Sequence, residues 1–521
     1  MKTRQFGKIA YLLVVFCVAA AVASPAQTFT TVRIFDGTDG YRAGSLVQGT
    51  NGNFYGTTQW GGPGFSKQDK LLGYGTIFAI APNGKFTTLY NFCTESLCAD
   101  GQTPNSGLIL AANGNFYGTT FAGGTSTNLP SSGTVFEITP AGQLTTLYSF
   151  CQHLSGPACT DGSYPSAGLV QGPNGNFYGT TQSGGTGSTS GGGGTIFEIT
   201  SAGTLTTLYN FCSQTNCKDG AEPVAALVLA SDGNFYGTTE KGGTKDKNPI
   251  CLSGCGTVFR FTPAGKLTTL YNFCSVSSSL PCEDGSLPTT PLVQGADGAL
   301  YGTTSAGGYS ASEAGSVFRI SPSGEMTTIY SFCIEAPCTD GDDPTAGLIE
   351  GSDGNLYGTT NQGGLYGGGS AFALSTTGAL TTLYSFCPQV SCADGEFPIA
   401  GLTQVTNGTF LGTTSAGARL AACDSDGQEG CGTVFSLSTG LDRFVEANPA
   451  FGAAGRSVNI LGNNLTGATS VTFNGTPATT FIVVSSNLIK AQVPAGATTG
   501  TIVVTTPSGT LNSNVAFQVV P

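Results

Sequence analysis

The sequence predicts an all-β protein: a seven-bladed β-propeller closed by an N-terminal strand and followed by a small Ig-like β-sandwich. One sequence repeat recurs along most of the chain. Each copy contains four short apolar or β-branched runs bounded by Asn-Gly, Gly-Gly or Ala-Gly pairs. No helical periodicity is evident. Four such runs form one antiparallel sheet, and radial stacking of the copies buries the faces that a single sheet leaves exposed.

Residues 1–26 have the pattern of a cleaved secretory signal peptide. Lys2, Arg4 and Lys8 precede an apolar run from Ile9 to Val22, and small residues follow it. The alternatives are an uncleaved membrane anchor and lipid attachment at Cys17. However, the run is short for a span of about 20 residues, and no small residues precede Cys17. We therefore expect an exported chain, secreted or at the cell surface, with no membrane span after cleavage.

The composition argues against a nucleic-acid partner. The signal peptide contains three cationic residues and no acidic residue, so its removal changes the formal net charge from −12 to −15. Binding to nucleic acid depends on cationic contacts to phosphates. Glycine supplies 79 of 521 residues and only 10% are charged, which is typical of many short strands joined by tight turns.

The sixteen cysteines after the signal peptide fall into eight local pairs. Zinc is the competing interpretation, but a metal site needs four converging ligands and the chain has one histidine, His153. We predict eight local disulfides that stiffen loops: Cys93/Cys98, Cys151/Cys159, Cys212/Cys217, Cys251/Cys255, Cys274/Cys282, Cys333/Cys338, Cys387/Cys392 and Cys423/Cys431.

Seven Gly-Thr-Thr signatures number the copies one to seven. They begin at Gly56, Gly118, Gly179, Gly237, Gly302, Gly358 and Gly412. Copy seven stops after residues 433–437 and lacks its fourth run, whereas residues 28–35 (TFTTVRIF) supply such a run at the other end of the chain. We expect residues 28–35 to pair with 433–437, which removes two exposed sheet edges, within a propeller of residues 28–439.

This closure also predicts the strand order within a copy, from GLVQG innermost through NFYGTT and GTIF to LTTLY outermost. The tight turns then lie on one face of the propeller, which we call the turn face. The opposite, long-loop face carries the GG loops, which follow each Gly-Thr-Thr signature, and the cysteine loops, which join one copy to the next. Function commonly resides in loops held by a rigid scaffold.

Three recurring motifs carry a family resemblance: GLVQGxNGNFYGTTxxGG, GTVFEITPAGxLTTLYSFC and CxDGxxP. Over about residues 29–437 the chain resembles the GloVer (Gloeo/Verruco) tandem repeat of secreted bacterial proteins. The resemblance implies export and a repeat architecture, and it brings no settled activity.

A different module begins after Leu441. Short strands alternate with Gly, Asn and Pro turns over residues 441–521, which suits a small β-sandwich. The stretches VTFNGTPAT and VPAGATTGTIVVTTPSG resemble the IPT/TIG class of Ig-like domains. By analogy, this resemblance implies a spacer or a carbohydrate-associated module.

One aspartate precedes a glycine at each copy junction. Around a ring, these acids would surround one mouth of the central channel, where they could attract calcium or bind sugar hydroxyls. Asp-Gly is also what a tight turn needs, and its presence in every copy favours that structural interpretation. The six candidates are Asp100, Asp161, Asp219, Asp284, Asp340 and Asp394, with Asp36 or Asp39 at the first junction.

The GG loops differ from copy to copy, so they are the better candidates for a ligand site. Copies one and seven adjoin across the predicted closure, and their loops carry Trp60, Tyr74, Arg419, Asp424 and Asp426. An aromatic platform with polar groups beside it suits a carbohydrate, although ordinary packing of Trp60 against a neighbouring loop is the favoured interpretation of that residue. The segment DSDGQE at 424–429 is a weak match to a calcium loop.

Catalysis is poorly supported. His153 is the sole imidazole, and no carboxylate pair stands out from the many equivalent acids. We expect an extracellular binding protein for a glycan or another ligand, with no cofactor except possible calcium. A polysaccharide-acting enzyme and a purely structural surface component are the alternatives.

Overall fold

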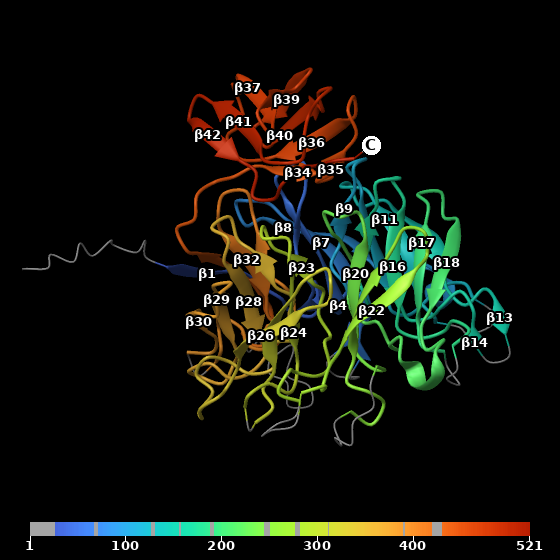
Figure 1. Cartoon of the computed structure of the whole chain (residues 1–521). Coiled ribbons are helices and arrows are strands. Elements are labelled where there is room, and N and C mark those ends of the chain that lie inside the picture. Colours follow the sequence, from blue (N-terminus) through green and yellow to red (C-terminus); the bar gives the residue numbers. More distant parts are fainter. Residues whose placement is uncertain are drawn as a thin grey trace, which may run out of the picture.

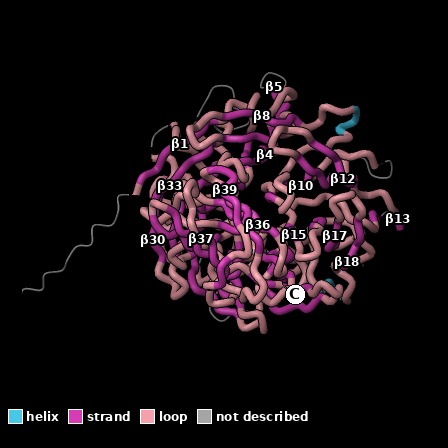
Figure 2. The backbone as a smooth tube through the Cα atoms, turned by 90° about the horizontal axis from the view of Figure 1, so that it is seen from above, coloured by secondary structure: helices cyan, strands magenta, loops and turns pink. Residues whose placement is uncertain are grey.

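The computed structural model describes residues 27–66, 71–126, 131–155, 158–187, 192–243, 251–276, 282–310, 312–388, 391–418 and 430–520. The protein is all-β, and each sequence copy forms one antiparallel sheet (Figure 1). Viewed from above, these sheets are arranged around a common centre (Figure 2). No helix in the described part of the chain has the length and apolarity needed to cross a bilayer.

The sheets of copies one to three follow one another along the chain. Copy one has five strands: β2 (Tyr41–Ala43), β3 (Val47–Gln48), β4 (Phe54–Trp60), β7 (Thr76–Ile80) and β8 (Phe86–Asn91). Copy two has β9 (Ile109–Leu110), β10 (Phe116–Thr120), β11 (Thr134–Ile138) and β12 (Leu144–Ser149). Copy three has β15 (Val170–Gln171), β16 (Phe177–Thr181), β17 (Thr195–Ile199) and β18 (Leu205–Asn210).

Copies four to six repeat this plan. Copy four has β19 (Val228–Leu229), β20 (Phe235–Thr239), β21 (Thr257–Phe261) and β22 (Leu267–Asn272). Copy five has β23 (Val293–Gln294), β24 (Leu300–Thr304), β25 (Ser316–Ile320) and β26 (Met326–Ser331). Copy six has β27 (Ile349–Glu350), β28 (Leu356–Thr360), β29 (Ser370–Leu374) and β30 (Leu380–Ser385).

The sheet of copy seven takes its outer strand from the N-terminus. Its strands are β31 (Thr403–Gln404), β32 (Phe410–Thr413), β33 (Thr433–Ser438) and β1 (Thr28–Ile34). β1 pairs antiparallel with β33, with Phe29 opposite Leu437, as the sequence predicts. The ring of Phe29 stacks on Tyr384 of copy six at 3.9 Å between centroids.

The loops contain two small hairpins and two 3₁₀ turns. The pairs β5 (Phe65–Ser66) with β6 (Leu71–Leu72), and β13 (Leu154–Ser155) with β14 (Ala158–Cys159), form small hairpins. Two 3₁₀ turns, η1 (Ser96–Cys98) and η2 (Thr215–Cys217), lie in cysteine loops.

The first two positions of the Gly-Thr-Thr signature each have a structural reason. In copy three, a Cβ on Gly179 would lie 2.6 Å from the Phe197 ring on the neighbouring strand, so only glycine fits. The Thr180 hydroxyl donates to the Ala225 carbonyl of copy four at 3.3 Å. The equivalent hydroxyl of Thr413 in copy seven donates to the Ala43 carbonyl of copy one at 2.9 Å. Equivalent bonds link copy one to two, two to three and four to five, whereas the buried Thr359 hydroxyl of copy six has no hydrogen-bond partner among the described residues. The bond between copies seven and one therefore matches those between several other neighbouring copies.

Residues 446–519 form the second module. One sheet contains β34 (Glu446–Asn448), β36 (Ser457–Leu461), β40 (Leu488–Gln492) and β39 (Phe481–Ser485). A second contains β38 (Thr476–Pro477), β37 (Ser470–Phe473), β41 (Ile502–Thr506) and β42 (Gly509–Asn512), and a parallel pair joins β35 (Phe451–Gly452) to β43 (Gln518–Val519).

This module packs against the turn face of the repeat (Figure 1). Leu461 and Leu488 join one apolar cluster with Tyr55 of copy one. The Asn448 side chain donates to the Leu110 carbonyl at 2.8 Å, and the Asn463 side chain donates to the Thr406 hydroxyl at 2.6 Å. The module therefore occupies part of the turn face, on the side opposite the long loops.

Candidate ligand-binding face

Two of the five predicted ligand-site residues lie in the described part of the chain. Trp60 ends β4 and is half-buried, because it packs against the apolar cluster that contains Phe35 and Tyr41. Tyr74, in the same GG loop, leaves 43% of its surface exposed. Arg419, Asp424 and Asp426 lie outside the described residues. The structure therefore does not test whether these five side chains converge.

The predicted channel-mouth acids are absent from the residues that line the central cavity described below, and they lie in hydrogen-bond networks with the outer strands. Asp161 is typical of the six. It is 4% exposed, and it accepts hydrogen bonds from the Tyr148 hydroxyl at 2.8 Å and from the Gln152 backbone N–H at 2.9 Å. The carboxylate thus fixes the cysteine loop to the outermost strand, which is the turn-forming role of Asp-Gly.

The same tyrosine bond recurs at the other five acids. Hydroxyl groups donate over 2.7–2.9 Å from Tyr90 to Asp100, Tyr209 to Asp219, Tyr271 to Asp284, Tyr330 to Asp340 and Tyr384 to Asp394. Burial, with the neighbouring carboxylate, raises the pKa of Tyr90 to about 12. At the first junction, Asp39 occupies this place, and the Arg33 guanidinium of β1 donates to it instead of a tyrosine. An aspartate held by a strand residue is therefore common to all seven junctions.

All seven sequence copies contribute to one central cavity of about 540 Å³. Small residues line it at equivalent positions of the seven copies: Ser45, Gly107, Gly168, Ala226, Pro291, Gly347 and Gly401. Towards the long-loop face the lining is more varied, with Asn105, Ser166, Val224, Thr289, Thr345 and Ile399. This volume lies within the range of small-molecule sites, which is roughly 300–1,000 Å³.

Three buried hydroxyl oxygens of this lining have no hydrogen-bond partner among the described residues. They belong to Ser166, Thr289 and Thr345. Because buried polar atoms nearly always have a partner, these three oxygens mark polar positions just behind the surface of the cavity. The cavity therefore combines an apolar wall with a few unsatisfied polar groups.

A strained backbone position recurs in each copy close to the residues that line the cavity. Seven non-glycine residues, one per copy, adopt left-handed φ angles of 55–58°. Six of them lie two residues before a cavity-lining residue, and the seventh, Arg42, lines the cavity itself. We call these the rim residues: Arg42, Thr103, Tyr164, Glu222, Leu287, Asp343 and Phe397.

One backbone hydrogen bond holds each rim residue in this conformation. Its N–H donates to a carbonyl of the preceding copy's GG loop, over 2.8–3.4 Å. The Thr103 N–H reaches the Tyr74 carbonyl in GG loop one, and the Arg42 N–H reaches the Cys431 carbonyl at the end of GG loop seven. The rim is therefore continuous with both loops that the sequence predicts as a ligand site.

The seven rim residues are seven different amino acids, although an Asp-Gly pair precedes every one of them and a proline follows those of copies two to seven. Glycine adopts positive φ without the steric cost that other residues incur there, about 1–3 kcal/mol each. Strained non-glycine residues of this kind cluster at functional sites. The rim thus breaks the symmetry of the repeat where a ligand could exploit it.

The rim is chemically divided. On one side the Tyr164 ring stacks on Phe121 at 5.1 Å, which supplies an aromatic surface. On another, Glu222 pairs with Lys241 at 2.8 Å, and burial raises the pKa of the neighbouring Glu240. Aromatic area beside charged and amide groups is the composition of many carbohydrate-sized sites.

Sequence analysis did not single out the rim residues. The signal was available, because each is the last variable letter before proline in the motif CxDGxxP of copies two to seven. Variation inside an otherwise constant motif marks a position that the fold does not dictate.

The predicted disulfides form in the described residues. Seven of the eight pairs are bonded: Cys93–Cys98, Cys151–Cys159, Cys212–Cys217, Cys251–Cys255, Cys274–Cys282, Cys333–Cys338 and Cys387–Cys392. Cys431 is also disulfide-bonded, whereas its predicted partner, Cys423, lies outside the described residues.

Comparison with known proteins identifies both modules. A model of the Gloeobacter/Verrucomicrobia repeat matches residues 20–247 and 213–423, and a model of the IPT/TIG domain matches residues 444–519. No curated protein matches the sequence.

Several solved structures are similar at low identity. One is a putative gluconolactonase, with 10% identity and a TM-score of 0.36, covering 80% of this chain and 94% of that one. A putative 6-phosphogluconolactonase from Bacteroides uniformis shows 16% identity and a TM-score of 0.39, over 65% and 84% of the two chains. PorZ, a surface component of the type-IX secretion system of Porphyromonas gingivalis, shows 11% identity and a TM-score of 0.44, over 94% and 60%.

Proposed function

The chain belongs to the Gloeobacter/Verrucomicrobia repeat family, and from this premise we propose that it is an extracellular, non-catalytic protein that binds a glycan at the long-loop face. The observation that carries the proposal is the rim, where one strained position holds seven different side chains around a cavity. Residues 1–26 would export the chain, and the seven bonded cysteine pairs are typical of an oxidising compartment.

The scaffold of this proposal is a closed, seven-bladed β-propeller. The support is the pairing of β1 with β33, together with the Thr413 hydroxyl bond that links copy seven to copy one in the way that other neighbouring copies are linked. We propose domains at residues 28–439 and 441–521, the second being a spacer that covers part of the turn face. Closure would hold the rim residues in a fixed ring, which lowers the entropic cost of binding.

Within this ring, the sector of copies one and seven is the best candidate for the ligand. The rim residues Arg42 and Phe397 lie there, and Gln59, next to Trp60, lines the cavity. Tyr74 offers an exposed ring at the edge of the same sector. Arg419, Asp424 and Asp426 would add charge from GG loop seven. The glycan would stack on an aromatic ring and donate hydroxyl protons to polar groups of the rim and cavity.

A glycan array with calcium and with chelator is the first test. The ligand it finds is then titrated by calorimetry against Trp60→Ala, Tyr74→Ala and the matched control Tyr366→Ala. Tyr366 lies in GG loop six and is 51% exposed, close to the 43% of Tyr74. Loss of a stacking ring should cost about 1–3 kcal/mol, a weakening of about 5- to 150-fold.

The expected result is weaker binding by the Trp60 and Tyr74 variants and unchanged binding by the Tyr366 variant. Equal binding by all three variants would refute the location of the site. Absence of any glycan ligand would instead favour a purely structural surface component.

A further inference from the structure

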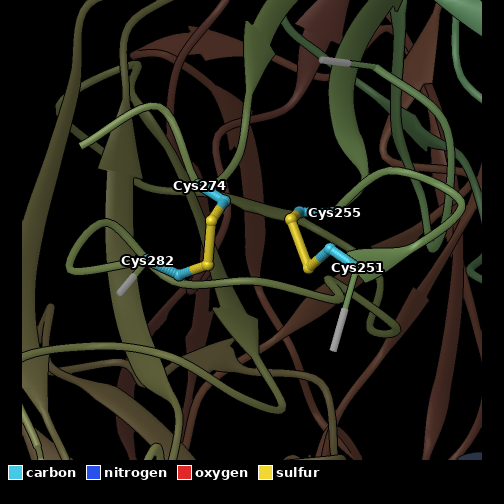
Figure 3. Close-up of side chains that lie close together, drawn as sticks. All are labelled: Cys251, Cys255, Cys274 and Cys282. Carbon is cyan, nitrogen blue, oxygen red and sulfur yellow. A yellow bond between two sulfur atoms is a disulfide. The ribbon is translucent and has the colours of Figure 1, made fainter. Parts of the chain in front are cut away.

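Copy four contains two disulfides side by side (Figure 3). Cys251–Cys255 lies at the end of the GG loop, and Cys274–Cys282 closes the cysteine loop. All four sulfur atoms lie within 4.8 Å of one another. All four residues are buried, with at most 6% of their surface exposed.

The strand pairing explains why the two pairs meet. Cys255 lies two residues before β21 and Cys274 lies two residues after β22, where Thr257 pairs with Asn272. The Phe273 N–H donates to the Gly256 carbonyl at 3.1 Å, which extends the ladder to the cysteines. Cys255 and Cys274 therefore lie side by side at the end of the sheet. Each loop also brings its other cysteine, Cys251 or Cys282, to this point.

This convergence is specific to copy four among the described residues. Copy five has the pair Cys333–Cys338 in its cysteine loop but has Ala314 where copy four has Cys255. In the described residues, each of the other cysteine loops is closed by a single pair, with no second pair beside it. The second pair of copy four is therefore an addition that the fold does not need.

Four converging cysteine sulfurs are also the ligand set of a tetrahedral zinc site. With Zn–S bonds of about 2.3 Å, the sulfur atoms of such a site lie about 3.8 Å apart. The present spread of up to 4.8 Å requires shifts of about 1 Å or less for each sulfur atom. The three residues between Cys251 and Cys255 match the two to four that separate paired zinc ligands.

We propose that the chain, while these cysteines are reduced, binds one zinc ion through Cys251, Cys255, Cys274 and Cys282, and that disulfide formation expels the ion. Four thiols lose four protons when they bind Zn²⁺ as thiolates. Two molecules of an organic disulfide, such as oxidised glutathione, then accept four electrons and four protons and become four thiols. The products on the protein are the two disulfides of Figure 3 and one released Zn²⁺. The cluster thus has a reduced, metal-binding state and an oxidised, disulfide state.

The test uses the full chain, reduced with a phosphine under anaerobic conditions and titrated with cobalt(II) as a spectroscopic substitute for zinc. One equivalent should produce thiolate charge-transfer bands and the intense d–d bands of a tetrahedral site. The double variant Cys251→Ser/Cys255→Ser should bind cobalt at least about tenfold more weakly. The control Cys333→Ser/Cys338→Ser removes one pair from copy five and should bind cobalt as the unmodified chain does.

Alkylation of the reduced chain gives a second readout that does not depend on a variant. Zinc should protect the four cysteines of copy four from iodoacetamide and leave Cys333 and Cys338 reactive in the same molecule, as mass spectrometry of peptides would show. Equal reactivity of all six cysteines in the presence of zinc would overturn the proposal. Two results with the reduced chain would also overturn the proposal. In the first, the chain keeps its β-sheet circular dichroism signal but binds no cobalt. In the second, the chain loses that signal and does not regain it when zinc is added.

Discussion

The hydrogen bond between Tyr148 and Asp161 gives a direct test of the structural role of the junction aspartates. Tyr148→Phe removes only the hydroxyl group, so the ring keeps its edge contact with Phe150 at 5.5 Å. Asp161 keeps its two backbone N–H donors, from Gln152 at 2.9 Å and His153 at 3.3 Å. The substitution therefore isolates one charge-assisted hydrogen bond.

The expected loss of stability follows from burial. Asp161 is 4% exposed, so water cannot readily replace the missing donor. A hydrogen bond to a buried charged group contributes about 1.5–3 kcal/mol, which is the expected decrease in the free energy of unfolding. Tyr90→Phe is a graded comparison, because Asp100 also accepts a hydrogen bond from the Thr94 hydroxyl at 3.0 Å. Its effect should be smaller than that of Tyr148→Phe.

The assay is urea unfolding followed by circular dichroism at neutral pH, with disulfides intact. If Tyr148→Phe changes the free energy of unfolding by less than about 0.5 kcal/mol, the carboxylate does not need this donor, and our account of the junction aspartates is wrong. An effect of Tyr90→Phe larger than that of Tyr148→Phe would also contradict it.

The remaining two predictions concern the closure and the junction of the two modules. Phe29→Ala removes the ring that stacks on Tyr384, and it should lower the free energy of unfolding by about 2–4 kcal/mol. Unchanged denaturant unfolding would mean that the packing of β1 against copy six does not stabilise the protein. Burial raises the pKa of the Glu446 carboxyl from 4.5 to about 7. The folded state therefore keeps a proton that the unfolded state releases, and this contribution to stability is complete below about pH 4.5 and is lost as the pH rises to about 7. In thermal scans, Glu446→Gln should have a higher melting temperature than the unmodified chain at pH 8 and the same melting temperature near pH 4. If the two chains differ in melting temperature by the same amount at both pH values, the carboxyl does not titrate in this way.

Features that depend on residues close in sequence could be predicted without the structure. The strand order within each copy follows from four short runs and the turns between them, because hairpin connections pair neighbouring runs. The disulfides join cysteines only four to eight positions apart, so their pairing follows from spacing. The pairing of 28–34 with 433–438 is distant along the chain. It was nevertheless predictable, since copy seven lacks one run that the N-terminus supplies.

Other features depend on contacts between copies, which no single repeat encodes. The sequence predicts a ring of acids from the junction aspartates, but in the structure each of them accepts a hydrogen bond from a tyrosine or arginine of an outer strand. The sequence allowed two interpretations of Trp60, an exposed platform or a packed ring, and the structure shows that the side chain is half-buried. The four cysteines of copy four converge only because β21 and β22 end together, and the left-handed φ angle that the rim residues share is seen only in the structure. In each case, local pattern determined which residues are present, whereas the packing of one sheet against the next decided what each side chain contacts.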